Sequence, residues 1–172
     1  FDSNIIKDQF KHFNLDSPKL RKLASGLTED GYLRIGGTNA DRIIFNPTNE
    51  YILNTTQVDS ICNFVRELGW TLVYDLNVSQ RKKDGSWDPT NSVKLIDYFS
   101  EKNITVHYEL GNEPDHFKRI FNFTVPPQQL AKDFKRLRSI INERTGGRSM
   151  LIGPDEGNIW DPYFEKVLSG LS

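Results

Sequence analysis

Short apolar runs rich in β-branched residues alternate with longer amphipathic runs along the whole chain. The short runs predict four strands, at residues 32–37, 70–78, 104–113 and 149–155. Five helical segments flank and separate them, near residues 17–26, 55–68, 91–102, 127–144 and 161–168. Strands that are joined by helical crossovers lie parallel, with right-handed connections. The alternation therefore predicts an α/β fold built on a parallel sheet.

The length of the chain decides between two forms of such a sheet. A complete (β/α)8 barrel needs roughly 250 residues, whereas this chain has 172. An open doubly wound sheet fits the length, but it would carry a phosphate-binding glycine loop after its first strand. GGTNAD, at residues 36–41, matches neither G-x-G-x-x-G nor a P-loop. We therefore expect a partial (β/α)8 TIM barrel, with residues 1–172 as the N-terminal half of one domain. The remaining barrel strands and any C-terminal β-domain then lie outside this chain, and an open α/β domain of unrelated function is the alternative.

Polar side chains follow every predicted strand at the point where it ends. They are Thr38, Asn39, Asp41, Asn77, Asn112, Glu113, Asp155, Glu156 and Asn158. In a parallel barrel the carboxyl ends of the strands share one rim, where catalytic groups are normally mounted. The four exits therefore predict one polar site.

Glu113 is the strongest candidate for a general acid in this set. Gly111 and Pro114 restrict the backbone on either side, and the amide of Asn112 can hydrogen-bond a substrate hydroxyl. Strict alternation would place Asn112 and Glu113 on opposite faces, so both serve one cleft only if the strand bulges or ends there. The alternative is that G-N-E-P is merely a strand-to-helix turn rich in turn-forming residues.

The charge balance argues against wholesale binding to nucleic acid. The formal net charge is -1, so any polyanion would have to meet a local basic cluster. Arg81, Lys82 and Lys83 form such a cluster after the second predicted strand. A solvated loop surface is the alternative interpretation of these three residues.

Four N-x-S/T tripeptides favour a secreted or lysosomal glycoprotein that works in the extracellular matrix. They begin at Asn54, Asn77, Asn103 and Asn122. Cys62, the only cysteine, falls in an apolar-periodic run and is expected to be a small buried hydrophobe. The sequence contains no run of about 18 apolar residues, which a transmembrane helix would need. The first ten residues are not a signal peptide, so we expect the numbering to begin after processing or inside a longer precursor.

Several separated motifs resemble one known family. LGNEP at residues 110–114 resembles the acid/base motif of the retaining glycosidases of the large (β/α)8 clan. LDSPKLRKLASGL, YLRIGGTNADRIIF, YELGNEPDHF and LIGPDEG are similar, in order and spacing, to the heparanase family, glycoside hydrolase family 79. The resemblance covers most of the chain.

The resemblance implies an endo-β-glucuronidase that hydrolyses heparan sulfate by a retaining two-carboxylate mechanism, with no metal and no cofactor. Glu113 would be the proton donor, and Asn112 would hold the 2-OH of the glucuronic acid at the cleavage point. Asp41 would bind substrate hydroxyls at a neighbouring subsite, and Asn158 falls where the family carries an amide that contacts sugar. Thr38 and Asn77, at the other strand exits, complete the expected substrate-binding set.

The sequence also departs from the family pattern. An arginine pair that family members carry just beyond the amide is replaced by Ile159, Trp160 and Asp161, and a basic stretch of the mammalian members has no counterpart in FNPTNEYILNTT. Arg81, Lys82 and Lys83 are candidates to compensate by binding sulfate. In the mammalian members that basic stretch follows an excised linker, whereas here FNPTNEYILNTT passes straight into the next predicted helix. The absence of the linker suggests a single-chain enzyme that needs no proteolytic activation.

The resemblance places the nucleophile, a second glutamate, on a later strand outside this chain. We therefore expect these 172 residues to supply the acid/base and to be inactive alone. A non-catalytic heparan-sulfate-binding glycoprotein or truncated isoform, and an exo-β-glucuronidase, are the alternatives.

Overall fold

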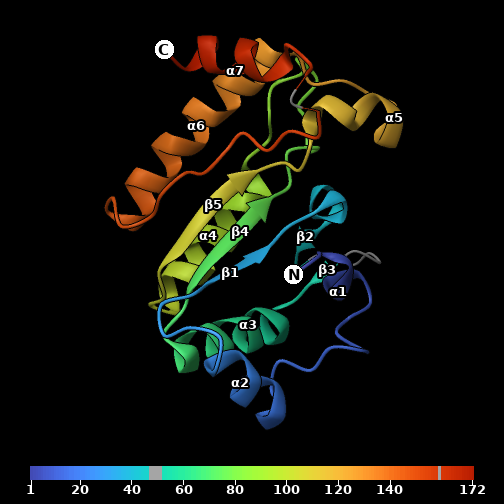
Figure 1. Ribbon diagram of the computed structural model, residues 1–172. Coiled ribbons are helices and arrows are strands. Elements are labelled where there is room, and N and C mark those ends of the chain that lie inside the picture. Colours follow the sequence, from blue (N-terminus) through green and yellow to red (C-terminus); the bar gives the residue numbers. More distant parts are fainter. Residues whose placement is uncertain (47–51, 159) are drawn as a thin grey trace.

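The computed structural model describes residues 1–46, 52–158 and 160–172. Its elements are α1 (Asn4–Lys7), α2 (Pro18–Ser25), β1 (Tyr32–Ile35), the 3-10 helix η1 (Thr38–Arg42), β2 (Ile44–Phe45), β3 (Ile52–Leu53), α3 (Thr55–Leu68), β4 (Thr71–Leu76), α4 (Thr90–Glu101), β5 (Val106–Leu110), the 3-10 helix η2 (Pro114–His116), α5 (Phe117–Phe121), α6 (Pro127–Thr145) and α7 (Tyr163–Leu171). Within these ranges, β1, β4 and β5 form the central parallel sheet in that order (Figure 1). Helix α3 precedes β4 and α4 precedes β5, so the predicted partial (β/α)8 architecture is confirmed.

Local sequence signals set the start of the helices. Asn54 precedes α3, and its side chain accepts a hydrogen bond from the backbone N–H of Gln57 at 2.9 Å. The Gln57 side chain in turn accepts from the backbone N–H of Asn54 at 2.9 Å, which completes a capping box. Ser17 caps α2 in a similar way, followed by Pro18 at the first helical position.

The two faces of the sheet differ in chemistry. Leu72, Tyr74 and Leu76 alternate along β4 and are buried in the apolar core. The ring of Tyr74 lies 5.5 Å from that of Phe99 on α4, so this face packs against the helices. Because side chains of a strand alternate between faces, Asp75 on β4 lies on the opposite face, beside its register partner on β5, Glu109. The helices thus cover an apolar face and leave a polar one.

The prediction of a strand at residues 149–155 is wrong in its length. Only Leu151 pairs, in a parallel bridge with Tyr108 of β5. The Tyr108 N–H donates to the Met150 carbonyl at 2.9 Å, and the Ile152 N–H donates to the Tyr108 carbonyl at 2.8 Å. Pairing stops there because Gly153 has a φ of 118° and turns the chain, and Pro154 has no N–H to donate. The segment still runs parallel to β5.

Other details extend or correct the predicted pattern. A second parallel pair, β2 with β3, was not predicted. Residues 47–51, part of the segment expected to pass straight into α3, lie outside the described residues. On α2, Ala24 is buried, whereas the apolar side chain of Leu23 is 62% exposed. Cys62 is buried as expected, and burial raises the pKa of its thiol to about 12.

The N-terminal segment lies beside β1. Asp2 forms a parallel bridge with Gly36, so the chain end adds a short edge next to the first strand. In the described part of the chain, no helix combines the length and apolar character needed to cross a membrane.

Candidate active site

The end of β5 brings Asn112 and Glu113 to the rim of the sheet. The strand stops at Leu110, and Gly111 follows with a φ of 78°. Glu113 is also left-handed, with φ 51° and ψ 58°, an uncommon conformation for a residue other than glycine. Asn112 is buried, whereas the Glu113 side chain is 36% exposed. The strand therefore ends before the pair, which meets the condition under which both residues can serve one cleft.

Asp41 of η1 holds the backbone at this exit through two hydrogen bonds. Its carboxylate accepts the backbone N–H of Asn112 and the backbone N–H of Val78, each at 2.9 Å. These bonds tie η1 to the ends of both β4 and β5. Burial raises the pKa of Asp41 to about 7, although the two backbone hydrogen bonds act in the other direction. The side chain is 1% exposed, so the structure places it as a support of Asn112 rather than in contact with solvent.

Arg34 of β1 orients the Asn112 side chain. Its Nη2 donates to Asn112 Oδ1 at 3.4 Å and to Asp155 Oδ2 at 2.8 Å. Its Nε donates to Glu109 Oε2 at 2.8 Å. Because Arg34 occupies the amide oxygen of Asn112, the amide NH2 is the end left to meet a substrate hydroxyl.

Asp75 is the most deeply buried acid of this face. Neither of its carboxyl oxygens has a hydrogen-bond partner among the described residues. Burial raises its pKa well above the ordinary value, and the nearby carboxylates of Asp41 and Glu109 add to the effect. Burial also raises the pKa of Glu109, against the influence of Arg34. The polar face thus carries protonatable carboxyl groups directly below the rim.

Asp115 and His116 follow Glu113 and connect it to the last loop. His116 Nδ1 lies 3.6 Å from Glu113 Oε2, and its Nε2 lies 3.4 Å from the buried Asp115 Oδ2. Asp115 Oδ1 accepts the backbone N–H of Gly157 at 3.1 Å. The ring of His116 packs against Gly157 so closely that a Cβ there would lie 2.3 Å from His116 Cε1. The loop after residue 153 is therefore held against the exit of β5.

The other predicted substrate-binding residues are placed differently. Asn158 is exposed in that loop. Thr38 is half-buried at the start of η1. Asn77 is engaged internally: its Nδ2 donates to the Ile43 carbonyl at 3.0 Å, and its Oδ1 accepts from the Ser79 N–H at 2.8 Å. The structure therefore brings Asn112, Glu113 and Asp41 together, with Asn158 tethered nearby, while Asn77 serves as a structural bridge.

The basic cluster at residues 81–83 is split. Arg81 is 14% exposed and pairs with the buried Asp133 of α6. Asp133 also accepts from the Trp87 N–H at 3.2 Å, so the pair braces the β4–α4 loop against α6. Lys82 and Lys83 are exposed. Of the three residues expected to bind sulfate, Lys82 and Lys83 are therefore the two whose side chains are exposed to solvent.

The four sequons differ in accessibility. Asn54, Asn103 and Asn122 are exposed, whereas Asn77 is half-buried. The Asn77 Nδ2, to which a glycan would attach, is bonded to the Ile43 carbonyl. A glycan at Asn77 would break this bond, so the three other sequons are the accessible ones.

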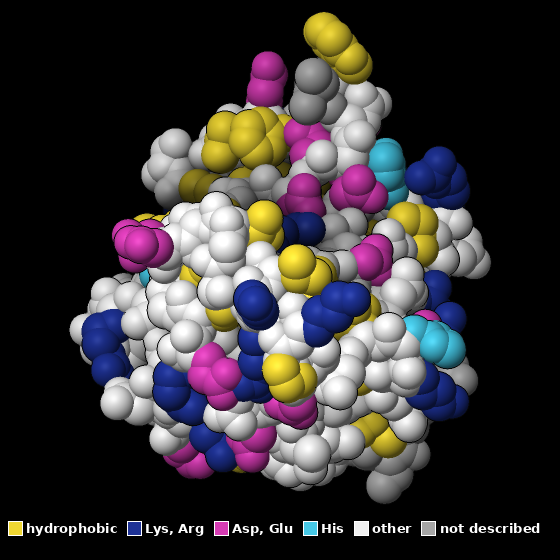
Figure 2. Space-filling model, turned by 60° about the horizontal axis from the view of Figure 1, so that its bottom comes forward, with side chains coloured by type: hydrophobic (Ala, Val, Ile, Leu, Met, Phe, Trp, Pro, Cys, Tyr) yellow, Lys and Arg dark blue, Asp and Glu magenta, His cyan; other side chains and the backbone are white. Residues whose placement is uncertain are grey.

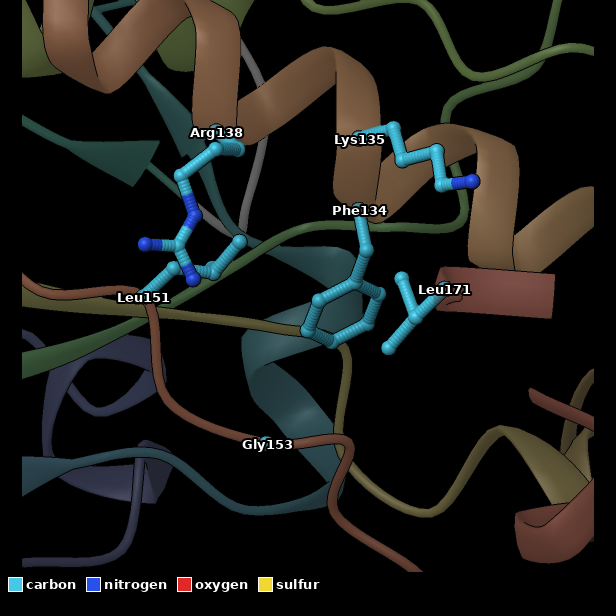
Figure 3. A pocket seen from close by; sticks show the side chains of 6 residues that line it. All are labelled: Phe134, Lys135, Arg138, Leu151, Gly153 and Leu171. Atoms are coloured by element: carbon cyan, nitrogen blue, oxygen red, sulfur yellow. The ribbon is translucent and has the colours of Figure 1, made fainter. Parts of the chain in front are cut away.

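A pocket of about 270 Å³ is lined by none of the predicted catalytic or substrate-binding residues. Phe134 points from α6 toward Leu171 of α7, and Arg138 extends over Leu151 (Figure 3). The pocket therefore belongs to the α6–α7 packing. No group of three or more His, Cys, Asp or Glu side chains suited to a metal ion occurs within residues 1–46, 52–158 and 160–172.

Sequence reasoning missed Arg34, Asp75 and Glu109, which build the polar face. The signal was present: each is a charged residue inside an otherwise apolar strand. Asp75 and Glu109 are register partners, so they had to lie on the same face.

A parallel sheet with helical crossovers and a polar rim at its carboxyl ends is the arrangement of a partial (β/α)8 barrel. The model of glycosyl hydrolase family 79, N-terminal domain, matches residues 48–171. The chain therefore belongs to glycosyl hydrolase family 79. It is 28% identical to heparanase of Bos taurus, over 91% of this chain and 38% of that protein. It is also 28% identical to hyaluronoglucuronidase of Hirudo nipponia, over 99% of this chain and 42% of that protein.

A third relative is inactive heparanase-2 of Mus musculus, 32% identical over 65% of this chain and 19% of that protein. The chain spans little more than a third of the length of the heparanases it matches. The relatives of this chain thus include proteins named as glycosidases and one named as inactive.

Proposed function

We propose that this chain carries the acid/base half of a retaining endo-β-glucuronidase that cleaves heparan sulfate or a related glucuronic-acid polysaccharide. The similarity to heparanase and to hyaluronoglucuronidase supports the glycosaminoglycan substrate. The observation that carries the assignment is the accessible Glu113 carboxyl beside the fixed amide of Asn112 at the exit of β5.

In the first step, the Glu113 carboxyl donates its proton to the glycosidic oxygen as the bond from that oxygen to the anomeric carbon breaks. A second carboxylate, from outside this chain, bonds to the anomeric carbon in the same step. In the second step, Glu113 takes a proton from the water that displaces this carboxylate. Asn112 donates its amide to the 2-OH of the sugar. Because the two carboxyl groups must lie about 5 Å apart, these 172 residues alone are expected to be inactive.

The direct test is the Glu113→Gln variant of the full-length protein, assayed on a heparan sulfate oligosaccharide. General acid/base catalysis contributes about 10²–10⁴-fold in rate, so kcat is expected to fall by that factor. Glu143→Gln, the same substitution at an exposed site on α6, is the matched control and is expected to retain full activity. An unchanged rate for Glu113→Gln would remove Glu113 from the chemistry.

A non-catalytic heparan-sulfate-binding glycoprotein is the second candidate, favoured by the similarity to inactive heparanase-2. The exposed Lys82 and Lys83 would supply the charge for such binding. This candidate predicts salt-dependent retention of the full-length protein on heparin without cleavage. An exo-β-glucuronidase would instead hydrolyse a small chromogenic glucuronide.

The proposal places the protein in the secretory pathway, as a secreted or lysosomal glycoprotein acting on the extracellular matrix. The accessible sequons at Asn54, Asn103 and Asn122 support it. Treatment of the native protein with an N-glycan-removing enzyme tests this location, since a cytosolic protein would show no change in mass.

A further inference from the structure

The three histidines of the chain differ in what surrounds them. His12 is exposed, and His107 Nδ1 accepts a backbone N–H at 3.2 Å, which accounts for its place in β5. His116, at the end of η2, lies between two carboxyl groups. Its Nδ1 is 3.6 Å from Glu113 Oε2, and its Nε2 is 3.4 Å from Asp115 Oδ2. His116 is therefore the histidine whose contacts point to a role at the site.

Two atoms of this contact are left without hydrogen bonds. Among the described residues, His116 Nδ1 and Asp115 Oδ2 are buried and neither has a hydrogen-bond partner. A buried polar atom without a partner is unfavourable, so such atoms are rare in folded proteins. An N–H···O hydrogen bond spans about 2.7–3.2 Å, so both distances from the ring are only slightly too long. Hydrogen bonds of catalytic groups are often long before the substrate binds and shorten in the complex.

The local backbone fixes the order of the three side chains. Glu113 is left-handed, and the His116 N–H donates to the Glu113 carbonyl at 2.9 Å, which closes the turn that brings the two side chains together. Asp115 is 3% exposed, and its Oδ1 accepts the Gly157 N–H at 3.1 Å, which leaves Oδ2 for the ring. The ring itself rests against Gly157, where an added Cβ would lie 2.3 Å from His116 Cε1. The imidazole is thus held edge-on between the two acids.

His116 is the one basic side chain within 4.0 Å of Glu113 or Asp115 in the part of the chain that the structure describes. Figure 2 shows acidic side chains gathered across the upper part of the molecule, while Lys and Arg dominate the middle and lower part of that face. A neutral imidazole has one N–H, so it can donate to one of the two carboxyl groups, whereas the imidazolium can donate to both. The charged ring is therefore the form that satisfies both acids at once.

We propose that His116 is a positioning residue for Glu113: as an imidazolium held by Asp115, it donates from Nδ1 to Glu113 Oε2 and leaves Oε1 to face the glycosidic oxygen. Because Oε2 is occupied, the proton that Glu113 transfers is carried on Oε1. After the transfer, the same N–H stabilises the Glu113 carboxylate until it takes a proton from water in the second step. His116 keeps both of its protons throughout. This role rests on the proposed function of Glu113 as the acid/base, and it adds the residue that orients it.

Two substitutions of nearly equal shape separate hydrogen-bond donation from the filling of space. Leucine and asparagine have similar side chains, but only the Asn Nδ2 can donate from the place of His116 Nδ1. The full-length protein is assayed on a heparan sulfate oligosaccharide. His116→Leu is expected to lower kcat about 10–100-fold and to change KM less than about twofold, because a misplaced acid slows the reaction without weakening binding. His116→Asn is expected to recover most of this loss, and His12→Ala, at the exposed histidine, is the control that changes neither constant.

A glucuronyl fluoride distinguishes positioning of the acid from a merely structural role. Fluoride leaves with little help from a general acid, so His116→Leu is expected to keep kcat/KM for this substrate within about twofold. The positioning role is overturned if His116→Leu leaves kcat for the oligosaccharide unchanged, if it lowers kcat/KM equally for both substrates, or if His116→Asn loses as much as His116→Leu. The proposed function fails separately, if Glu113→Gln leaves the rate on the oligosaccharide unchanged.

Discussion

Alanine at position 111 tests the geometry that delivers Glu113 to the rim. Gly111 has a φ of 78°, and an added Cβ would lie 2.3 Å from Cγ1 and 2.9 Å from Cβ of the buried Val78. The left-handed backbone costs a non-glycine residue about 1–2 kcal/mol, and forcing a methyl group into a packed site costs about 1–3 kcal/mol. The expected loss in the free energy of unfolding is therefore about 2–5 kcal/mol.

Gly85 provides a matched control for this substitution. Its φ of 82° is nearly the same, but nothing lies within 4 Å of the position of an added Cβ. Gly85→Ala should therefore lose only the backbone share, about 1–2 kcal/mol. Urea unfolding of both variants, monitored by tryptophan fluorescence, measures the difference between their losses in the free energy of unfolding. Equal losses would show that contact with Val78 does not constrain the exit of β5, and the account of how Glu113 is positioned would then be wrong.

Four further predictions follow from the described contacts. Asp75→Asn should stabilise the protein at pH 8 more than at pH 4. The pKa of Asp75 is raised in the folded state, so the free energy of unfolding of the unsubstituted protein falls as pH rises through that pKa, and asparagine, which does not titrate, avoids this loss. Equal effects at both pH values would contradict a buried, titrating carboxyl. Burial raises the pKa of Asp41 to about 7, so the free energy of unfolding should fall between about pH 4 and pH 8 in a pH series of urea unfolding, and a flat profile would argue against it. Asn54→Ala should cost about 1 kcal/mol in the same assay by removing the cap of α3, and a loss below a few tenths would show that the cap is not formed. Glycopeptide mass spectrometry of the native protein should find glycans on Asn54, Asn103 and Asn122 and none on Asn77; a glycan on Asn77 would contradict its bond to Ile43.

The sequence predicts the parallel α/β fold well because periodicity and caps are local signals. The strands around residues 32–37, 70–78 and 104–113 appear where apolar, β-branched residues cluster, and α3 begins and ends at its predicted residues. The segment at 149–155 has the same composition, yet it forms one bridge because Gly153 and Pro154 end its pairing with β5. Composition alone does not reveal how long a pairing lasts.

The candidate site was predicted less completely because its supports are long-range. Glu113 and Asn112 are adjacent and carry a recognisable motif. Their supports come from far along the chain: Arg34 bonds Glu109 across 75 positions and Asp155 across 121. Asp41 was expected to bind substrate, and the structure adds that its carboxylate accepts the backbone N–H groups of Val78 and Asn112. Such roles depend on which strands are neighbours, which no local pattern encodes.

The most direct test of the central claim compares leaving groups in the full-length protein. Glucuronyl oligosaccharides need a proton on the departing oxygen, whereas the corresponding glycosyl fluorides leave with little help from a general acid. If Glu113 is the proton donor, Glu113→Gln lowers kcat/KM for the oligosaccharide by about 10²–10⁴-fold and leaves kcat/KM for the fluoride largely intact. An equal loss on both substrates, or no loss on either, would contradict the account.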